Sequence, residues 1–286
     1  MRASDFDPFV EHAGGTAALV DLDPDHPGFR DAHYRRRRME IAQIALDYSP
    51  GSPVPAAHYS PEEHAIWGQI HSLLLPLHKE RACREITELQ DVLPLEPDRI
   101  PQLEELNSML QATSGFRMEP VAGLVVARTF MRYLGRQTFL STQYIRHHSR
   151  PLYTPEPDVI HELVGHAATL VHPAIAELSR VLGVAAEVAS DAEMIRLDRV
   201  YWYTLEFGLV AEDGRAKAFG AGLLSSVGEL TEFDTHARIE DWDLNRIAQT
   251  SFDPTAYQDR LFLAPSFTRL ICDVTAWVRT GQWRSL

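Results

Sequence analysis

The sequence predicts a mainly α fold, in which packed helices and a few short β-strands form a single domain. Apolar residues recur at helical spacing along most of the 286 residues, whereas stretches of alternating or β-branched residues are few and short. Apolar residues make up 45 % and charged residues 23 % of the chain, as in ordinary globular proteins long enough to bury a core. We therefore expect a loose N-terminal arm over residues 1–24 and one folded domain over residues 25–286.

Prolines and capping residues delimit the elements of the N-terminal half. A helix is expected from Phe29 to Tyr48, with the four arginines from Arg35 to Arg38 facing solvent. Ser60 to Glu63 forms a capping box with proline at the first helical position, and the helix that follows is expected to kink at Pro76. Pro101 to Gln111 has leucines at core spacing and predicts a further helix.

The C-terminal half contains a second capping box. It begins at Ser190, and the helix that it starts is expected to carry Glu206 and to end at Gly208. The other expected elements are a helix from Arg128 to Gln137, a short strand within Thr138 to Arg146, a turn at Asp213-Gly214 and a last core helix from Ser266 to Val278.

Charge and cysteine usage narrow the classes of function. A formal net charge of −13 argues against binding to nucleic acid or to an anionic membrane, because both select basic surfaces, so small molecules are the expected partners. Cys83 and Cys272 lie far apart, and no apolar stretch is long enough for a signal sequence or a membrane helix. We expect free thiols in a reducing, cytoplasmic compartment. The preference for arginine over lysine favours a GC-rich, bacterial genome.

The segment from Tyr153 to His166 carries the strongest chemical signal. His161 and His166 lie five residues apart, and Glu206 follows forty residues later in a Tyr-Trp-Tyr-Thr-Leu-Glu run. Two histidines and a carboxylate are the ligands of a facial-triad iron site, which leaves positions open for oxygen chemistry. On an ideal helix, residues five apart are rotated by roughly 140°. The two rings can reach one metal only if the turn is distorted or the site lies across a helix end.

Two other interpretations of these residues remain open at this point. A zinc hydrolase would use His161, Glu162 and His166, but its usual motif places the histidines four residues apart. Alternatively, both histidines are hydrogen-bonded core residues and Glu206 lies on the surface. From spacing alone, this second interpretation is as good as a metal site. A binding protein without activity is a third class.

A longer pattern supports the metal site. Eight segments resemble, in order and with similar spacing, the tetrahydropterin-dependent aromatic amino acid hydroxylases, most closely the phenylalanine hydroxylase catalytic domain. They cover the chain from about residue 25 to 267. The segments are Asp25–Phe29, Pro101–Glu104, Gly115–Arg117, Pro120–Leu124, Gln143–His147, Tyr153–His166, Tyr201–Gly208 and Lys217–Leu230.

The resemblance implies an iron- and pterin-dependent monooxygenase. Its metal ligands would be His161, His166 and Glu206, holding a mononuclear Fe(II). Such enzymes use O2 and a tetrahydropterin, tetrahydrobiopterin or a similar compound, to hydroxylate the ring of an aromatic amino acid. L-Phenylalanine to tyrosine is the first expectation. Hydroxylation to meta-tyrosine, or a tyrosine or tryptophan substrate, is the alternative.

The resemblance also assigns binding residues. Arg146 would hold the substrate carboxylate with its planar fork, and Asp158 would steady Arg146. The amino acid pocket would further be lined by Thr154, Pro155, Trp202, Phe207, Gly222 and Ser225. The pterin would contact the loop of Gly123, Leu124 and Val125, stack on Phe130 and meet Glu162 and Tyr201.

The chain departs from the family pattern at several places. Ala167-Ala168-Thr169-Leu170 follows His166, where the family usually has an apolar residue, proline and two more apolar residues. Ala127 and Asp198 stand at pterin-contact positions. Leu263 and Pro265 replace a valine and a glutamate near the substrate. These changes leave the ring position of hydroxylation open. The family's regulatory domain and tetramerisation helix are not expected, so we expect a monomer or at most a weak dimer.

Overall fold

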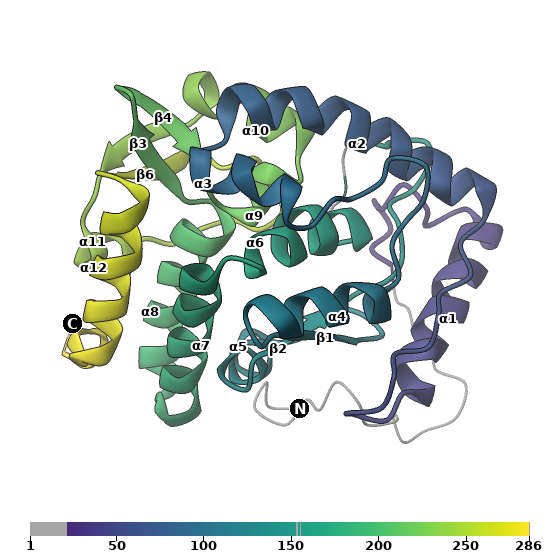
Figure 1. Cartoon of the computed structure of the whole chain (residues 1–286), viewed down its shortest axis with the longest axis horizontal. Coiled ribbons are helices and arrows are strands. Elements are labelled where there is room, and N and C mark those ends of the chain that lie inside the picture. The colour runs from purple at the N-terminus through teal and green to yellow at the C-terminus, as the bar shows by residue number, and fades with distance from the viewer. Residues whose placement is uncertain (1–21, 153, 155, 286) are drawn as a thin grey trace.

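The structure is a computed structural model of the chain, and it describes residues 22–285 except 153 and 155. Helices form most of it and short strands the rest (Figure 1), so the predicted mainly α fold is confirmed. The predicted arm lies almost wholly outside the described residues. The α-helices are α1 (Ala32–Asp47), α2 (Pro61–Arg81), α3 (Arg84–Thr87), α4 (Leu103–Thr113), α5 (Ala127–Gly135), α6 (Ala168–Leu170), α7 (Pro173–Val188), α8 (Asp191–Tyr201), α9 (Ala221–Leu224), α10 (Val227–His236), α11 (Leu244–Ile247) and α12 (Phe267–Arg279).

Two small sheets supplement the helices. β1 (Arg117–Pro120) pairs in parallel with β2 (Thr138–Ser141). The second sheet has the order β4-β3-β6-β5, with β3 (Leu209–Glu212) and β4 (Arg215–Ala218) antiparallel, and β6 (Arg260–Ala264) parallel to β3 and to β5 (Arg238–Asp241). The predicted turn at Asp213-Gly214 joins β3 to β4, and both residues have positive φ (49° and 73°), as two-residue hairpin turns of this composition require.

The capping predictions are confirmed, but one surface prediction is wrong. Ser60 caps α2 through Glu63, and Ser190 caps α8 through Glu193, each as a reciprocal capping box. The helix from Ser60 continues through Pro76 to Arg81. Arg38, expected to face solvent, is buried. Its guanidinium lies 3.2 Å from the centroid of the Tyr144 ring and pairs with Glu156 at 2.6 Å. These two partners compensate the loss of hydration that burial causes.

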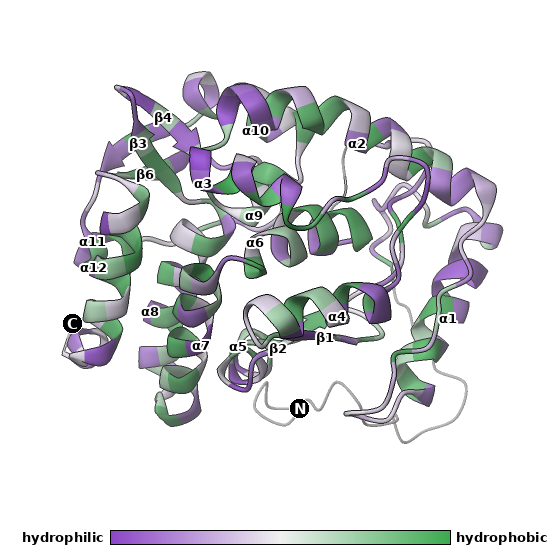
Figure 2. Ribbon diagram, viewed as in Figure 1, coloured by the Kyte–Doolittle hydropathy of each residue, from purple (hydrophilic) through white to green (hydrophobic). Residues whose placement is uncertain are grey.

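The core is built around α7, which packs against α5, α8 and α12 (Figure 1). Two glycines allow α5 and α7 to approach: a Cβ on Gly183 would lie 2.0 Å from the backbone nitrogen of Gly135. Figure 2 shows that hydrophobic residues alternate with hydrophilic ones along α7 and α12, as expected for helices with one face in the core.

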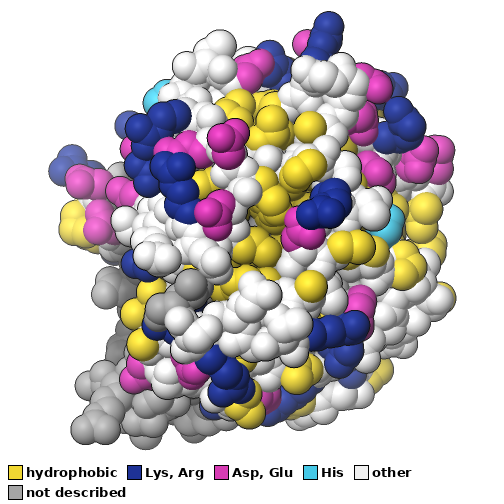
Figure 3. Space-filling model, turned by 90° about the vertical axis from the view of Figure 1, so that its left-hand side faces the viewer, with side chains coloured by type: hydrophobic (Ala, Val, Ile, Leu, Met, Phe, Trp, Pro, Cys, Tyr) yellow, Lys and Arg dark blue, Asp and Glu magenta, His cyan; other side chains and the backbone are white. Residues whose placement is uncertain are grey.

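The surface mixes charges of both signs. Figure 3, viewed from the side of α12, shows Lys and Arg side chains next to Asp and Glu side chains around a central band of hydrophobic ones. Among the described residues, none of the helices combines the length and the apolar composition that crossing a membrane needs.

Candidate metal centre and its pocket

The segments that carry the candidate metal ligands are π-helical turns. η3 (His161–Ala167) follows the loop after β2, and η4 (Trp202–Glu206) extends α8. In a π-turn each backbone N–H bonds to the carbonyl five residues earlier, and the 2.7 Å bond from Phe207 N–H to the Trp202 carbonyl has this register. The wider turn brings side chains five residues apart back to one face. It is the distortion that the spacing of His161 and His166 requires.

The three predicted ligands meet at one point. Nε2 of His166 lies 3.0 Å from Nε2 of His161 and 2.9 Å from Oε1 of Glu206. The remaining distance, from Nε2 of His161 to Oε2 of Glu206, is 3.5 Å. Ligand atoms bound at right angles, each about 2.1 Å from one ion, lie about 3 Å apart. The donor set therefore fits a single ion of the two-histidine, one-carboxylate class.

Burial and charge set the protonation of these groups. Burial lowers the pKa of His161 to about 4, so its ring is neutral at physiological pH. In His166 burial acts in the same direction, but the carboxylate of Glu206 outweighs it and raises the pKa. In Glu206 burial favours the protonated form, but His166, then His161 and the Tyr201 hydroxyl, lower its pKa to about 2. Neutral imidazole and ionised carboxylate are the forms that bind metal.

Helix α9 supports the turn from behind. The hydroxyl of Ser225 donates to the carbonyl of Ala221 at 2.7 Å, so it is free to accept from Nδ1–H of His161 at 3.0 Å. This bond keeps the proton on Nδ1 and leaves the lone pair of Nε2 toward Glu206. Gly165 allows the close approach, since a Cβ there would lie 2.8 Å from the Ala221 carbonyl oxygen. Ser225, predicted to line the amino acid pocket, thus contacts His161.

Arg146 and Asp158 form a buried bidentate pair. Nε and Nη2 of Arg146 donate to the two carboxylate oxygens at 2.9 and 2.8 Å, and the Arg146 backbone N–H donates at 2.8 Å. Asp158 also accepts the backbone N–H of His161 at 3.3 Å, which ties the pair to η3. Burial would raise the pKa of Asp158, but Arg146 holds it below its usual range. Nη1 of Arg146 makes only a long contact, 3.5 Å, with the Pro151 carbonyl among the described residues.

The aromatic residues predicted for the substrate lie together. The ring of Trp202 is 4.7 Å from that of Phe207 and stacks on Phe252 at 4.1 Å. Gly222 lies directly beneath Phe207, because a Cβ there would come within 2.5 Å of its ring. Thr154 is described only through its hydroxyl, which donates to the Glu156 carbonyl, and Pro155 lies outside the described residues.

The residues predicted for the pterin lie at two depths. Phe130 packs edge-on against Tyr201, 5.7 Å between ring centroids, and Tyr201 in turn bonds to Glu206. Glu162 is buried, and burial raises its pKa to about 8. Gly123, Leu124 and Val125 form the loop before α5, and Leu124 is 62 % exposed. The inner residues are therefore connected to the metal ligands, and the loop lies at the surface.

Two residues that the sequence did not single out complete this arrangement. Thr142 donates its backbone N–H and its hydroxyl to one oxygen of Glu162, at 3.2 and 3.0 Å. The ring of Phe139 lies 4.6 Å from that of His166 and 5.3 Å from that of Phe130. Phe139 lies within β2, and Thr142 directly follows the strand. Their signal in the sequence is only their place shortly before Arg146.

Comparisons with known proteins agree with this geometry. Residues 2–283 match the family model of biopterin-dependent aromatic amino acid hydroxylases. The chain is 41 % identical over 277 residues to the chloroplastic phenylalanine 4-monooxygenase of Pinus taeda, covering 96 % of this chain and 77 % of that protein. It is 43 % identical over 253 residues to the tyrosine 3-monooxygenase of Mus musculus, covering 87 % of this chain and 51 % of that protein.

Solved structures give the same result. A phenylalanine hydroxylase of Chromobacterium violaceum aligns with a TM-score of 0.78 and 29 % identity, over 93 % of this chain and 95 % of that one. A structure of the same bacterial enzyme with iron(III) and 7,8-dihydrobiopterin aligns with a TM-score of 0.77 and 28 % identity, over 93 % and 94 %. The matched residues, the fold and the donor set agree, and this chain belongs to the biopterin-dependent aromatic amino acid hydroxylases.

Proposed function

We propose that this enzyme converts L-phenylalanine to tyrosine with Fe(II), O2 and a tetrahydropterin. The observation that carries the proposal is the buried group of His161, His166 and Glu206 beside the Arg146–Asp158 pair. The relatives from Pinus taeda and Chromobacterium violaceum, both named for phenylalanine, favour that substrate. The mouse relative, named for tyrosine, makes tyrosine the second candidate.

In this proposal, the iron is held by His161, His166 and Glu206, and when bound it supplies the activation of dioxygen. The chain's own contribution is to present three donors without rearrangement. Ser225 fixes the tautomer of His161, and the Tyr201 hydroxyl orients the Glu206 carboxylate. The zinc-hydrolase alternative has no support, because the chain belongs to the biopterin-dependent aromatic amino acid hydroxylases.

The amino acid is bound through its carboxylate by Arg146. Asp158 uses Nε and one hydrogen of Nη2, so both Nη atoms keep hydrogens for a second carboxylate. The ring of the amino acid would pack against the faces of Trp202 and Phe207, and Gly222 leaves the space that the Phe207 ring occupies. Because Asp158 also holds the His161 backbone N–H, one carboxylate sets the distance between the clamp and the metal turn. Thr154 and Pro155 are proposed to close this pocket.

The pterin is proposed to stack on Phe130 and to meet Glu162 and Tyr201. The edge-on packing of Phe130 on Phe139 and Tyr201 supports this role, because it fixes the ring that the pterin would cover. The loop of Gly123, Leu124 and Val125 offers backbone groups from the solvent side. We also propose a monomeric protein in the reducing cytoplasm of a bacterium, which fits two free cysteines.

The test is an anaerobically iron-loaded assay with a tetrahydropterin, O2 and each of the three aromatic amino acids. Products are separated by chromatography against ring-isomer standards. para-Tyrosine from phenylalanine is the expected result. meta-Tyrosine would overturn the proposed ring position and direct attention to the residues after His166, from Ala167 to Leu170, and to Leu263. No pterin-dependent product from any of the three would overturn the proposal.

A further inference from the structure

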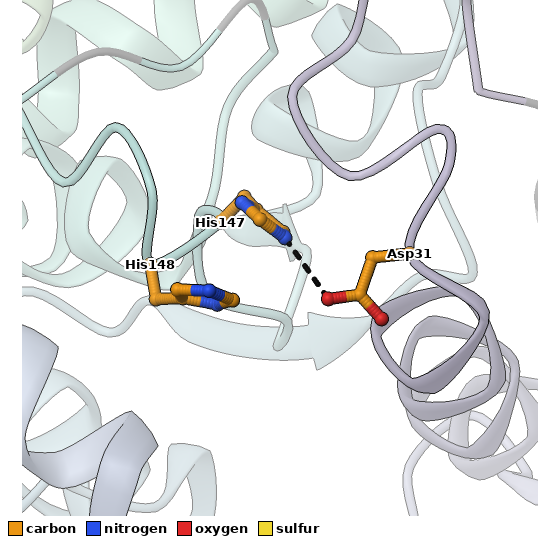
Figure 4. A group of neighbouring side chains, drawn as sticks. All are labelled: Asp31, His147 and His148. Atoms are coloured by element: carbon orange, nitrogen blue, oxygen red, sulfur yellow. Dashed lines mark hydrogen bonds and ion pairs between the residues drawn. The ribbon is translucent and has the colours of Figure 1, made fainter.

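A second group of metal-binding side chains lies away from the catalytic centre. It consists of Asp31, which caps α1, and His147 and His148, which follow Arg146. One ligand atom from each lies within 4.8 Å of those of the other two. Figure 4 shows the two imidazoles and the carboxylate facing a common space. None of the three has a role in the catalytic site described above.

The inner pair is already in contact. Nε2 of His147 lies 3.3 Å from Oδ2 of Asp31, the dashed line in Figure 4. The other oxygen of Asp31 accepts the backbone N–H groups of His33 and Tyr34, so Oδ2 is the one that faces the histidines. The Tyr34 N–H bond and then His147 lower the pKa of Asp31, which keeps it ionised at neutral pH. Tyr34 also packs edge-on against the His147 ring at 4.9 Å.

The outer imidazole has no competing partner. The rings of His147 and His148 lie 4.2 Å apart, and His148 is exposed with no hydrogen bond recorded to the described part of the chain. Ser149 holds the ring of His147, because its backbone N–H donates to Nδ1 at 3.2 Å and its hydroxyl lies 2.8 Å from the same atom. Because Nδ1 accepts, the neutral ring carries its proton on Nε2 and donates it to Oδ2 of Asp31. A cation at Nε2 would displace this proton, and the ring could then carry its proton on Nδ1, where the Ser149 hydroxyl can accept it.

We propose that Asp31, His147 and His148 bind a second divalent transition-metal ion of the zinc type. Two imidazole nitrogens and one carboxylate oxygen suit Zn²⁺. Because His148 is exposed, water can take the fourth coordination position of the ion. The ion joins the start of α1 to the loop that carries Arg146, 116 residues apart in sequence. It therefore stabilises the loop from which the carboxylate clamp projects.

The experiment is a Zn²⁺ titration of the metal-free full chain with a competing chelator, with bound zinc counted by mass spectrometry. The expected stoichiometry is two per chain for the wild type and one for His161→Ala, which loses the inner site. His148→Ala is also expected to bind one, and the double variant none. Asp31→Asn keeps an oxygen for capping α1 and loses the carboxylate, so its outer site should weaken by at least about 10-fold.

His58→Ala, which removes an exposed histidine elsewhere, is the matched control and should bind two ions with wild-type affinity. On the iron-loaded enzyme, one equivalent of Zn²⁺ should bind without release of iron. A wild-type stoichiometry of one, lost in His161→Ala, would overturn the proposal. So would a second zinc whose affinity is unchanged in both His148→Ala and Asp31→Asn. Neither result depends on the amino acid that the enzyme hydroxylates.

Discussion

Helix α7 and the metal-binding turn η3 are neighbours in the chain, yet burial acts on them differently. α7 buries one face and exposes residues such as Val184 and Val188 on the other. η3 buries every residue from Glu162 to Ala167. A helix with an exposed face can direct its polar groups to water, but a turn buried all round cannot. The polar groups of η3 therefore bond to one another and to Glu206, Ser225 and Thr142.

The comparison separates residues that only stabilise the fold from residues that also build the site. In α7, Gly183 allows close packing on α5, Ser179 makes an ordinary hydrogen bond within the helix, and Arg180 forms a surface ion pair. Around η3, Gly165 lets the metal-binding turn pack on α9, Ser225 sets the tautomer of His161, and Arg146 is the guanidinium of the carboxylate clamp. Each site residue thus has a counterpart in α7 against which its variant can be compared.

The largest expected effect is that of Arg146→Ala compared with Arg180→Ala in α7. Removing Arg146 leaves Asp158 charged and buried, and breaking such a pair costs about 3–5 kcal/mol. The Arg180–Glu177 pair is more than one-third exposed on both sides, so its loss should cost less than about 1 kcal/mol. The measurement is urea unfolding. An equal loss of stability in both variants would contradict the buried ion pair of Arg146 and Asp158.

Arg146 should also control substrate affinity. Arg146→Lys keeps the charge but loses the planar fork, and we expect KM for the amino acid to rise about 100-fold with a smaller change in kcat. Steady-state kinetics of Arg146→Lys and Arg180→Lys test this. An unchanged KM in Arg146→Lys would contradict the proposed role of the guanidinium.

The next effect is that of Gly165→Ala compared with Gly183→Ala. Each new Cβ would meet backbone at 2.8 Å or less, so both variants should lose about 1–3 kcal/mol or more of stability. Only Gly165→Ala displaces η3 from α9 and should lower iron occupancy. Unfolding and metal content are measured on both. Equal iron content in the two variants would mean that the packing of η3 on α9 does not set the metal site.

A smaller effect is expected for Ser225→Ala compared with Ser179→Ala. Both hydroxyls are buried and donate to the carbonyl four residues earlier, at 2.7 and 2.9 Å. Ser225 alone also holds His161, so its variant should bind iron about 10–100-fold more weakly. Competition with a chelator measures the affinity. A loss of the same size in Ser179→Ala would assign the effect to general destabilisation.

The smallest expected effect concerns Glu229, a half-buried carboxylate that accepts the backbone N–H of Gln258. Burial raises the pKa of Glu229 from 4.5 to about 7, whereas His166, then His161 and the Tyr201 hydroxyl, lower that of Glu206. The folded state holds the proton of Glu229 more tightly than the unfolded state does. The contribution of this carboxyl to the free energy of unfolding is therefore fully present below pH 4.5 and is lost as the pH rises through 7. The free energy of unfolding of Glu229→Gln should therefore exceed that of the wild type by on the order of 1–2 kcal/mol at pH 8, and should equal it at pH 4.

Urea unfolding at the two pH values checks this prediction. Glu232→Gln, on the same helix but exposed, is the control and should follow the wild type. If the free energy of unfolding changed with pH equally in Glu229→Gln and in the wild type, the pKa of Glu229 would not be raised.

The sequence predicted the elements whose signals are local. The capping boxes at Ser60 and Ser190 and the turn at Asp213 depend on neighbouring residues, and each is confirmed. Arg38 was misplaced because its partners, Tyr144 and Glu156, lie more than 100 residues away in sequence. No local pattern distinguishes it from the exposed Arg35 and Arg36.

The site was predictable in composition but not in geometry. The spacing of His161 and His166 required a distorted turn, yet only the structure shows that the distortion is a π-turn repeated at Glu206. The helix expected to run from Ser190 to Gly208 changes register after Tyr201 for the same reason. Ser225 was expected beside the substrate, and its contact with His161 depends on packing between η3 and α9 that spacing cannot reveal.

The most direct test of the central claim is the iron content of the wild type and of His161→Ala, His166→Ala and Glu206→Ala, each loaded anaerobically with Fe(II) and desalted. His236→Ala, a histidine of α10, is the control. We expect one iron per chain in the wild type and the control, and a loss of bound iron and of pterin-dependent hydroxylation in the other three. Full iron content with wild-type turnover in any of those three would contradict it.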